Sequence, residues 1–193
     1  MKIIVLHNSV EPDNKNSVPA FYSKVDSTLL KGGKPFFIPD FAQQCELSIH
    51  LVARICRLGK GFSSRYAYRY VDAWTLGATF VAQNMKQDGM YIPSQAVDFD
   101  GSTMIGDFIM TQDIDMDTSK CKMQLGDCSY GDISLSQLGS TILDTVSRLS
   151  YFFTWKQGDL LFSLPLCCKP DVVENEHVSC EINNRLLLDF NIK

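Results

Sequence analysis

The sequence predicts an α+β fold that is rich in β-structure: a mixed β-sheet rolled into a barrel-like shape, with one long helix. Three observations predict it. Apolar and polar residues alternate along residues 46–58, which is the period of a strand. Residues 134–153 instead repeat apolar side chains every three or four positions, which is the period of a helix. The chain ends in two apolar segments separated by Asn183-Asn184, a pair that tolerates the positive φ of a tight hairpin turn. Many strands with few helices favour a roll or barrel.

At the N-terminus, residues 1–7 hold a short apolar run without a small-residue cleavage site. We therefore expect a first strand there rather than a signal peptide. Residues 8–19 are polar and contain Pro12 and Pro19, which predicts a loop. Residues 32–35, Gly-Gly-Lys-Pro, predict a turn. They lack the downstream Lys-Ser/Thr of a phosphate-binding loop.

The clearest strand is residues 46–58, because a strand sends successive side chains to opposite faces of its sheet. One face is apolar and the other is mostly polar. The apolar face carries Leu47, Ile49, Leu51, Ala53 and Ile55, and the other face carries Glu46, Ser48, His50, Val52 and Arg54. This strand is expected to be covered on its apolar face by the core.

The middle of the chain gives weaker signals. Ser63-Ser64 is a candidate cap for a short helix that continues to Tyr70. Residues 74–82 form a nearly continuous apolar run that predicts a buried strand, and residues 104–110 and 121–125 are further candidate strands.

The long helix is predicted over residues 134–153, with Ser134 as its cap. Its apolar stripe consists of Leu135, Leu138, Ile142, Val146, Leu149 and Phe153. Gly158-Asp159 then predicts a turn and residues 160–164 a buried strand. The terminal hairpin is expected to pair residues 177–183 with residues 185–190.

Length and composition exclude several classes of protein. The 193 residues suit a single domain, 1–193, with a sizeable core. The formal net charge of −4 gives no basic footprint for nucleic acid, and no apolar run approaches the roughly 20 residues of a membrane span. The seven cysteines are odd in number and include no Cys-x-x-Cys, which favours reduced thiols in the cytoplasm over a disulfide framework or a zinc knuckle.

Common catalytic motifs are missing, and His50 is the most interesting single residue. The sequence has neither His-Glu-x-x-His nor Gly-x-Ser-x-Gly. Residues 113–117, Asp-Ile-Asp-Met-Asp, start like a calcium loop, but Thr118 and Gln124 stand where that loop needs Gly and Glu. If the polar face of strand 46–58 lines a cavity, His50 can act as an acid or base near neutral pH or as one metal ligand. The alternative is a half-exposed strand histidine without a chemical role.

The order of five segments resembles the C-terminal catalytic domain of the fumarylacetoacetate hydrolase family, over about residues 3–192. The segments are residues 19–24 (Pro-Ala-Phe-Tyr-Ser-Lys), strand 46–55, residues 70–75 (Tyr-Val-Asp-Ala-Trp-Thr), helix 134–153 followed by residues 155–161 (Trp-Lys-Gln-Gly-Asp-Leu-Leu), and the hairpin 176–192. The resemblance implies a mixed β-sheet roll of the fumarylacetoacetate hydrolase type and a homodimer. It also implies a site that holds Mg²⁺ or Mn²⁺ on three carboxylates, where the metal grips an oxo-acid and stabilises an enolate.

This sequence departs from the family pattern at the metal ligands. By resemblance, the two Glu positions fall on Ser48 and His50 and the Asp position falls on Thr79. The following Arg and Asp fall on Gln83 and Asn84. A neutral hydroxyl or an imidazole is a poor substitute for a carboxylate around Mg²⁺, so we expect no bound metal cofactor.

Other positions change as well. The lysine that the family carries upstream of a Phe-Asp pair is missing near residues 97–100 (Val-Asp-Phe-Asp), and the Thr-Gly-Thr-Pro loop is replaced by residues 162–165 (Phe-Ser-Leu-Pro). Lys24 is retained among the groups expected to face a substrate. The resemblance therefore gives Lys24, Ser48, Thr79 and Gln83 as pocket positions.

Two functions follow as hypotheses. In the first, the scaffold persists as a non-catalytic protein that binds a ligand, such as a small oxo-acid, or a partner. In the second, it is a hydrolase, isomerase or decarboxylase acting on a 2-oxo or 2-hydroxy-dienoate diacid, with His50 as acid or base and Lys24 holding a substrate carboxylate. The replaced carboxylates favour the first hypothesis.

Overall fold

The computed structural model describes residues 1–7, 20–30, 33–85 and 92–193; the predicted loop at 8–19 lies outside these ranges. The strands in chain order are β1 (Ile3–Leu6), β2 (Phe21–Lys24), β3 (Leu29–Leu30), β4 (Cys45–Ile55), β5 (Val71–Ala82), β6 (Thr103–Ile105), β7 (Ile109–Met110), β8 (Lys120–Leu125), β9 (Cys128–Ser134), β10 (Leu160–Phe162), β11 (Cys167–Lys169), β12 (His177–Ile182) and β13 (Arg185–Asn191). The helices are η1 (Asp26–Thr28), η2 (Ser64–Arg69), η3 (Gln83–Met85), α1 (Ser94–Val97), η4 (Thr111–Asp113) and α2 (Ser136–Leu149).

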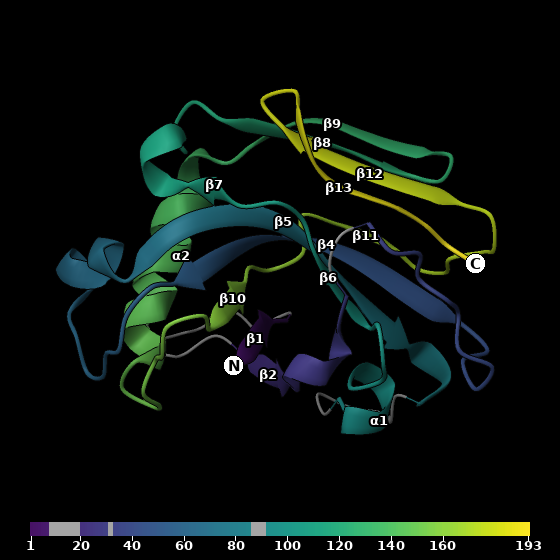
Figure 1. The fold of residues 1–193 in the computed structure, drawn as a ribbon, viewed down its shortest axis with the longest axis horizontal. Helices are drawn as coiled ribbons and strands as arrows, with labels where there is room; N and C mark the ends of the chain where they lie inside the picture. Colours follow the sequence, from purple (N-terminus) through teal and green to yellow (C-terminus); the bar gives the residue numbers. More distant parts are fainter. Residues whose placement is uncertain (8–19, 31–32, 86–91) are drawn as a thin grey trace.

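A curled nine-stranded sheet forms the half-barrel of the fold. Its main path runs β2-β1-β10-β4-β5-β6-β3, with β11 paired to β4 and β7 paired to β5. The two edge strands, β2 and β3, are separated by only the short segment 25–28. The sheet is mixed, because β1 pairs with β10 in parallel and β4 pairs with β5 antiparallel. The predicted mixed roll is therefore confirmed (Figure 1).

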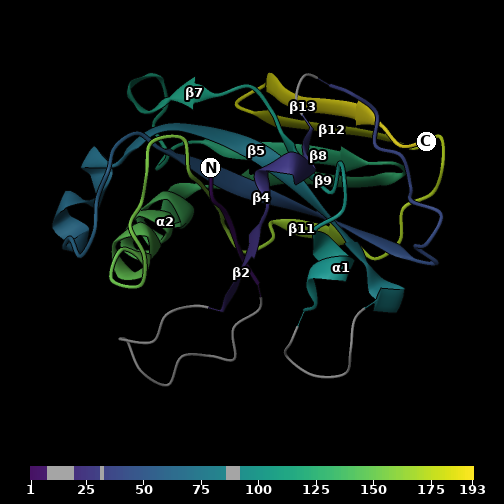
Figure 2. The ribbon, with the colours of Figure 1, turned by 60° about the horizontal axis from the view of Figure 1, so that its bottom comes forward.

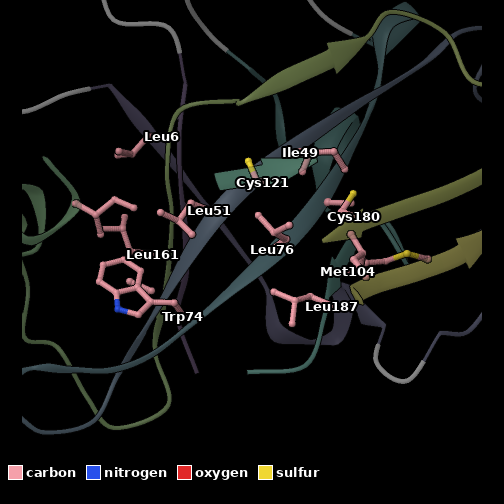
Figure 3. Packing of buried hydrophobic residues seen from close by; sticks show 14 of the residues in the cluster. Leu6, Ile49, Leu51, Trp74, Leu76, Met104, Cys121, Leu161, Cys180 and Leu187 are labelled. Carbon is pink, nitrogen blue, oxygen red and sulfur yellow. The ribbon is translucent and has the colours of Figure 1, made fainter. Parts of the chain in front are cut away.

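A second sheet, in the order β13-β12-β8-β9, covers one face of β4 and β5. It lies on one side of these strands, while β2 and α1 lie on the other (Figure 2). Between the two sheets, Ile49, Leu51 and Leu76 pack near Cys121 and Cys180 (Figure 3). Burial of this apolar layer is the main force that holds the two sheets together.

Helix α2 closes the core at one end. It is shorter than the predicted 134–153, because it ends at Leu149 and Phe153 lies beyond it. Leu135, not Ser134, holds the capping position, and no side chain caps the helix there. The Ser134 hydroxyl instead accepts the Ser136 N–H at 3.3 Å.

Several strand predictions are confirmed and several strands were missed. The terminal hairpin forms as expected, with φ of 50° at Asn183 and 63° at Asn184. The candidate strand 104–110 is split into β6 and β7. The segment after Ser63 is a 3-10 helix without a side-chain cap. Sequence patterns did not indicate β2, β3, β9 or β11, which are short or largely exposed and so carry little alternation.

Within the described ranges, no helix is long and apolar enough to cross a membrane.

Candidate functional site

The candidate site lies on the face of β4 and β5 that turns away from the second sheet. The register pairs Ser48 with Thr79 and His50 with Gly77. A Cβ at Gly77 would lie 2.6 Å from Phe162 Cε1 and 2.8 Å from Val52 Cγ2, so only glycine fits beside His50. Side chains from β1, β4 and β10 fill the neighbouring part of this face. The polar positions are thus enclosed by apolar walls.

His50 is buried, with 1% of its surface exposed, so the alternative of a half-exposed histidine is wrong. Its Nδ1 lies 2.7 Å from the Ser163 carbonyl oxygen, and its Nε2 lies 2.9 Å from Thr79 Oγ1. A carbonyl oxygen only accepts, so Nδ1 carries the proton and Nε2 accepts from the Thr79 hydroxyl. Burial lowers the His50 pKa to about 4, against the weaker raising effect of the bond to Ser163. His50 is therefore neutral at pH 7, with both ring nitrogens engaged.

Lys24 is equally buried and equally engaged. Its Nζ lies 2.5 Å from the Val97 carbonyl oxygen, 3.0 Å from the Ser102 carbonyl oxygen and 2.9 Å from Ser102 Oγ. An ammonium has three N–H donors, and these three acceptors match them. Burial lowers the Lys24 pKa to about 7, while the nearby Asp98 carboxylate opposes that shift. Lys24 ties edge strand β2 to the segment before β6, across the opening of the half-barrel.

A second polar group surrounds Ser48 at the more accessible end of the site. Ser48 Oγ lies 3.4 Å from Glu46 Oε1 and 3.2 Å from Cys168 Sγ. The Gln83 side-chain amide donates to Glu46 Oε2. Glu46 and Gln83 are half-buried and Cys168 is exposed. This group joins β4 to β11 and to the turn after β5.

The sequence analysis missed Tyr22 as a member of the site. Burial raises its pKa well above the ordinary tyrosine value, and a hydrogen bond to Thr79 opposes that rise. The signal was present in the sequence: Tyr22 lies two positions before Lys24, which in a strand places both side chains on one face.

All five positions predicted for the site lie on this one side of the sheet. Lys24, Ser48, His50, Thr79 and Gln83 come from β2, β4, β5 and the start of η3. Their predicted chemical roles remain predictions. The donor set does not fit a divalent metal well, because both His50 nitrogens and the Thr79 hydroxyl are engaged and none of the five residues is a carboxylate. Over the part of the chain that the structure describes, no three His, Cys, Asp or Glu side chains are grouped to hold a metal ion.

Comparison with known proteins connects this geometry to a family. Residues 5–167 match the family model described as fumarylacetoacetate (FAA) hydrolase, C-terminal. No curated protein matches the chain.

Solved structures share the fold at low sequence identity. A fumarylpyruvate hydrolase from Pseudomonas aeruginosa, in complex with Mn²⁺ and pyruvate, aligns with a TM-score of 0.82 and 18% identity over 100% of this chain and 89% of that one. A 2-hydroxyhepta-2,4-diene-1,7-dioate isomerase from Mycobacterium marinum aligns with a TM-score of 0.82 and 18% identity over 99% and 73%. A 5-carboxymethyl-2-hydroxymuconate delta-isomerase from Mycobacterium smegmatis aligns with a TM-score of 0.81 and 18% identity over 99% and 78%.

Proposed function

The chain belongs to the fumarylacetoacetate hydrolase family, and from this premise we propose that it is a divergent, non-catalytic member that binds a small ligand or a partner. The chemistry that Mn²⁺ supplies in such a fold is polarisation of an oxo-acid. In this proposal, the polar residues on the inner face of the half-barrel no longer hold that metal.

One observation carries the proposal: the deepest polar groups of the site satisfy one another. Both nitrogens of the His50 ring are hydrogen-bonded, one to Ser163 and one to Thr79. The Lys24 amine donates to Val97 and Ser102. A general base needs a lone pair free for the substrate proton, and a substrate-binding lysine needs a free donor. Each would have to give up a buried hydrogen bond, at a cost of about 1–3 kcal/mol.

Electrostatics support the same proposal. Burial holds His50 neutral and brings the Lys24 pKa to about 7, so the deep end of the site carries little fixed charge. Mg²⁺ and Mn²⁺ prefer several anionic oxygen ligands. A set of hydroxyl, imidazole and amine groups with little fixed charge is a poor environment for a bare divalent cation.

The test is thermal unfolding of the purified protein with Mg²⁺, Mn²⁺ or Zn²⁺, each with and without oxalate as an enolate mimic. A ligand at 100 times its dissociation constant adds about 2.7 kcal/mol of stability, which is several degrees. We expect no shift with any metal, and any shift with oxalate to be the same in the presence of a chelator. The fumarylpyruvate hydrolase from Pseudomonas aeruginosa is the positive control, because its structure contains Mn²⁺ and pyruvate.

A shift that needs Mn²⁺ or Mg²⁺ together with oxalate would contradict the proposal. Turnover of fumarylpyruvate that His50→Gln abolishes would favour instead the enzyme with His50 as acid or base.

Two further proposals accompany this function. All seven cysteines lie in described segments, and no disulfide joins them, which supports a reducing compartment such as the cytoplasm. A homodimer, as the resemblance implies, is testable by light scattering of the eluted protein.

A further inference from the structure

The connection between β4 and β5 forms a protrusion with an unusual surface. It projects beyond the end of the two strands, at the left of Figure 1. We name its exposed face the basic–aromatic ridge. The ridge consists of Arg57, Leu58, Lys60, Arg65, Tyr66, Tyr68 and Arg69, with Tyr151 and Phe152 from the segment after α2.

Contacts beneath the ridge join its backbone to the rest of the protein. Phe62 and Ala67 are buried under the protrusion. The Phe62 N–H donates to Ser150 Oγ at 3.1 Å, the Ser147 hydroxyl donates to the Phe62 carbonyl oxygen at 2.6 Å, and the Phe62 ring stacks on Tyr70 with centroids 3.7 Å apart. A preorganised surface loses little conformational entropy when a partner binds.

The cations of the ridge have no carboxylate beside them. Residues 54–70 contain five basic residues and no Asp or Glu, in a chain whose net charge is −4. In the described parts of the chain, no ion pair joins Arg57, Lys60, Arg65 or Arg69 to a carboxylate. Arg65 and Arg69 instead lie over the Tyr66 ring, at 4.5 Å and 5.2 Å from its centroid. The local field is therefore positive on a molecule that is negative elsewhere.

Apolar side chains are exposed beside these cations. Leu58 is 70% exposed, and Tyr151 and Phe152 are each 63% exposed. Tyrosine, phenylalanine and arginine are enriched in the buried centres of protein interfaces, and tyrosine and arginine are among the residues that dominate binding energy there. The ridge combines this composition with uncompensated positive charge.

We propose that the basic–aromatic ridge is a docking surface for an acidic segment of a partner protein, in which Asp or Glu alternates with aliphatic side chains. The guanidinium groups bind its carboxylates, and Leu58 and Phe152 cover its aliphatic residues. Single-stranded nucleic acid fits less well: guanidinium groups already cover Tyr66, where a base would stack, and the overall negative charge repels a polyanion.

This docking surface lies at the opposite end of β4 and β5 from Glu46 and Gln83. It goes beyond the proposed function, because it does not depend on what the polar site binds. Loss of metal or oxo-acid binding at that site leaves the docking proposal standing, and the reverse also holds.

The test is fluorescence anisotropy of a labelled 12-residue peptide of Asp, Glu, Leu and Phe, titrated with the full chain at low and physiological salt. We expect saturable binding that Arg65→Glu with Arg69→Glu weakens at least tenfold, and that Leu58→Ser weakens about threefold. The matched control is Lys120→Glu with Arg185→Glu, two reversals at exposed positions on the other sheet. The control variant should bind within twofold of the wild type. Thermal unfolding checks that both double variants are folded.

Four outcomes would overturn the proposal. In the first, the control variant weakens binding as much as the ridge variant. In the second, a peptide with Ser in place of Leu and Phe binds equally well. In the third, a 12-nucleotide oligo-dT or phosphatidylserine vesicles bind the ridge more tightly than the peptide.

The fourth concerns a second copy of this chain, which has its own alternating acidic segment at residues 113–117. Self-association that the ridge variant abolishes, measured by light scattering, would make that copy the occupant.

Discussion

The inner face of β4 and β5 and the connection between these strands place polar groups in opposite environments. On the inner face, the buried side chains of His50 and Thr79 are hydrogen-bonded inside the protein. On the connection, Arg65 and Arg69 are exposed and lie over the ring of Tyr66. In the first arrangement, the hydrogen bonds of the polar groups stabilise the fold. The second leaves charge and apolar surface available for another molecule.

This difference indicates two regions of the chain where a function can lie. Family resemblance points to the polar positions on the inner face of the half-barrel. The physical state of the side chains points also to the protrusion, which the family pattern does not mark. Substitutions on the inner face should therefore change the free energy of unfolding more than substitutions on the ridge.

The largest expected effect is at His50. Replacing His50 with Leu leaves the Ser163 carbonyl and the Thr79 hydroxyl without their buried partner, at about 1–3 kcal/mol each. We expect urea unfolding to report a loss of about 4 kcal/mol.

A control for this prediction is the pair Thr79→Val and Thr75→Val. Thr75 is also buried, and its hydroxyl makes a local hydrogen bond to the Leu76 carbonyl oxygen. Thr79→Val should cost more than Thr75→Val. Equal costs would mean that the bond to His50 contributes nothing.

Acid should destabilise the protein through the same histidine. Burial lowers the pKa of His50 to about 4 from its usual 6.5, so the unfolded chain binds more protons between these two values. Stability is fully present above pH 6.5 and falls as the pH drops towards 4, by about 3 kcal/mol. His50→Gln should remove this fall. If stability falls equally at low pH in the wild type and in His50→Gln, His50 does not cause the fall.

At Lys24 we expect a smaller effect on stability, at alkaline pH. Burial lowers its pKa to about 7 from 10.5, so the unfolded chain binds more protons between these values and stability rises with pH. Between pH 7 and 8.5, the wild type should gain about 2 kcal/mol more than Lys24→Met. The comparison with the variant cancels the opposite contribution of the buried cysteines, whose pKa values burial raises. No difference between the two proteins would mean that Lys24 titrates normally.

The smallest effect is expected at the ridge. Arg65→Glu with Arg69→Glu should leave the free energy of unfolding, measured by urea unfolding, nearly unchanged, because exposed charges and their aromatic contacts contribute little. A clear loss of stability would show that the ridge is structural, and would contradict the contrast between the inner face and the ridge.

The sequence predicted the long strands, the helix and the terminal hairpin, because each carries a strong local signal. Strand β4 alternates along most of its length, with Val52 as the exception, and Asn183-Asn184 favours a tight turn. The short strands β2, β3, β9 and β11 were missed, because each is too short or too exposed to alternate clearly. The strands β1 and β10 were predicted, but their pairing was not, because Ile3 and Leu160 lie 157 positions apart. Local patterns contain no information on such pairing.

At the site, the family resemblance identified the positions of the polar residues, but not their burial or their hydrogen-bond partners. Alternation alone could not show that the polar face of β4 is covered, so His50 was left open as a half-exposed residue. Its burial depends on β1, β10 and β2, which the curled sheet brings over it. The partners of Lys24 lie 73 and 78 residues further along the chain, and no motif marks them.

The parallel pair β1–β10 has a consequence for how the chain folds during synthesis. Ile3 faces Leu160 across this pair, so β1 obtains that neighbour only after nearly all of the intervening chain exists. At roughly 5–20 residues per second, the wait is on the order of ten seconds or more. During that time the apolar strand Ile3–Leu6 has only β2 beside it, and its other edge is open to association with foreign strands. This edge of β1 therefore stays unpaired until residues 160–162, which form β10, have been synthesised.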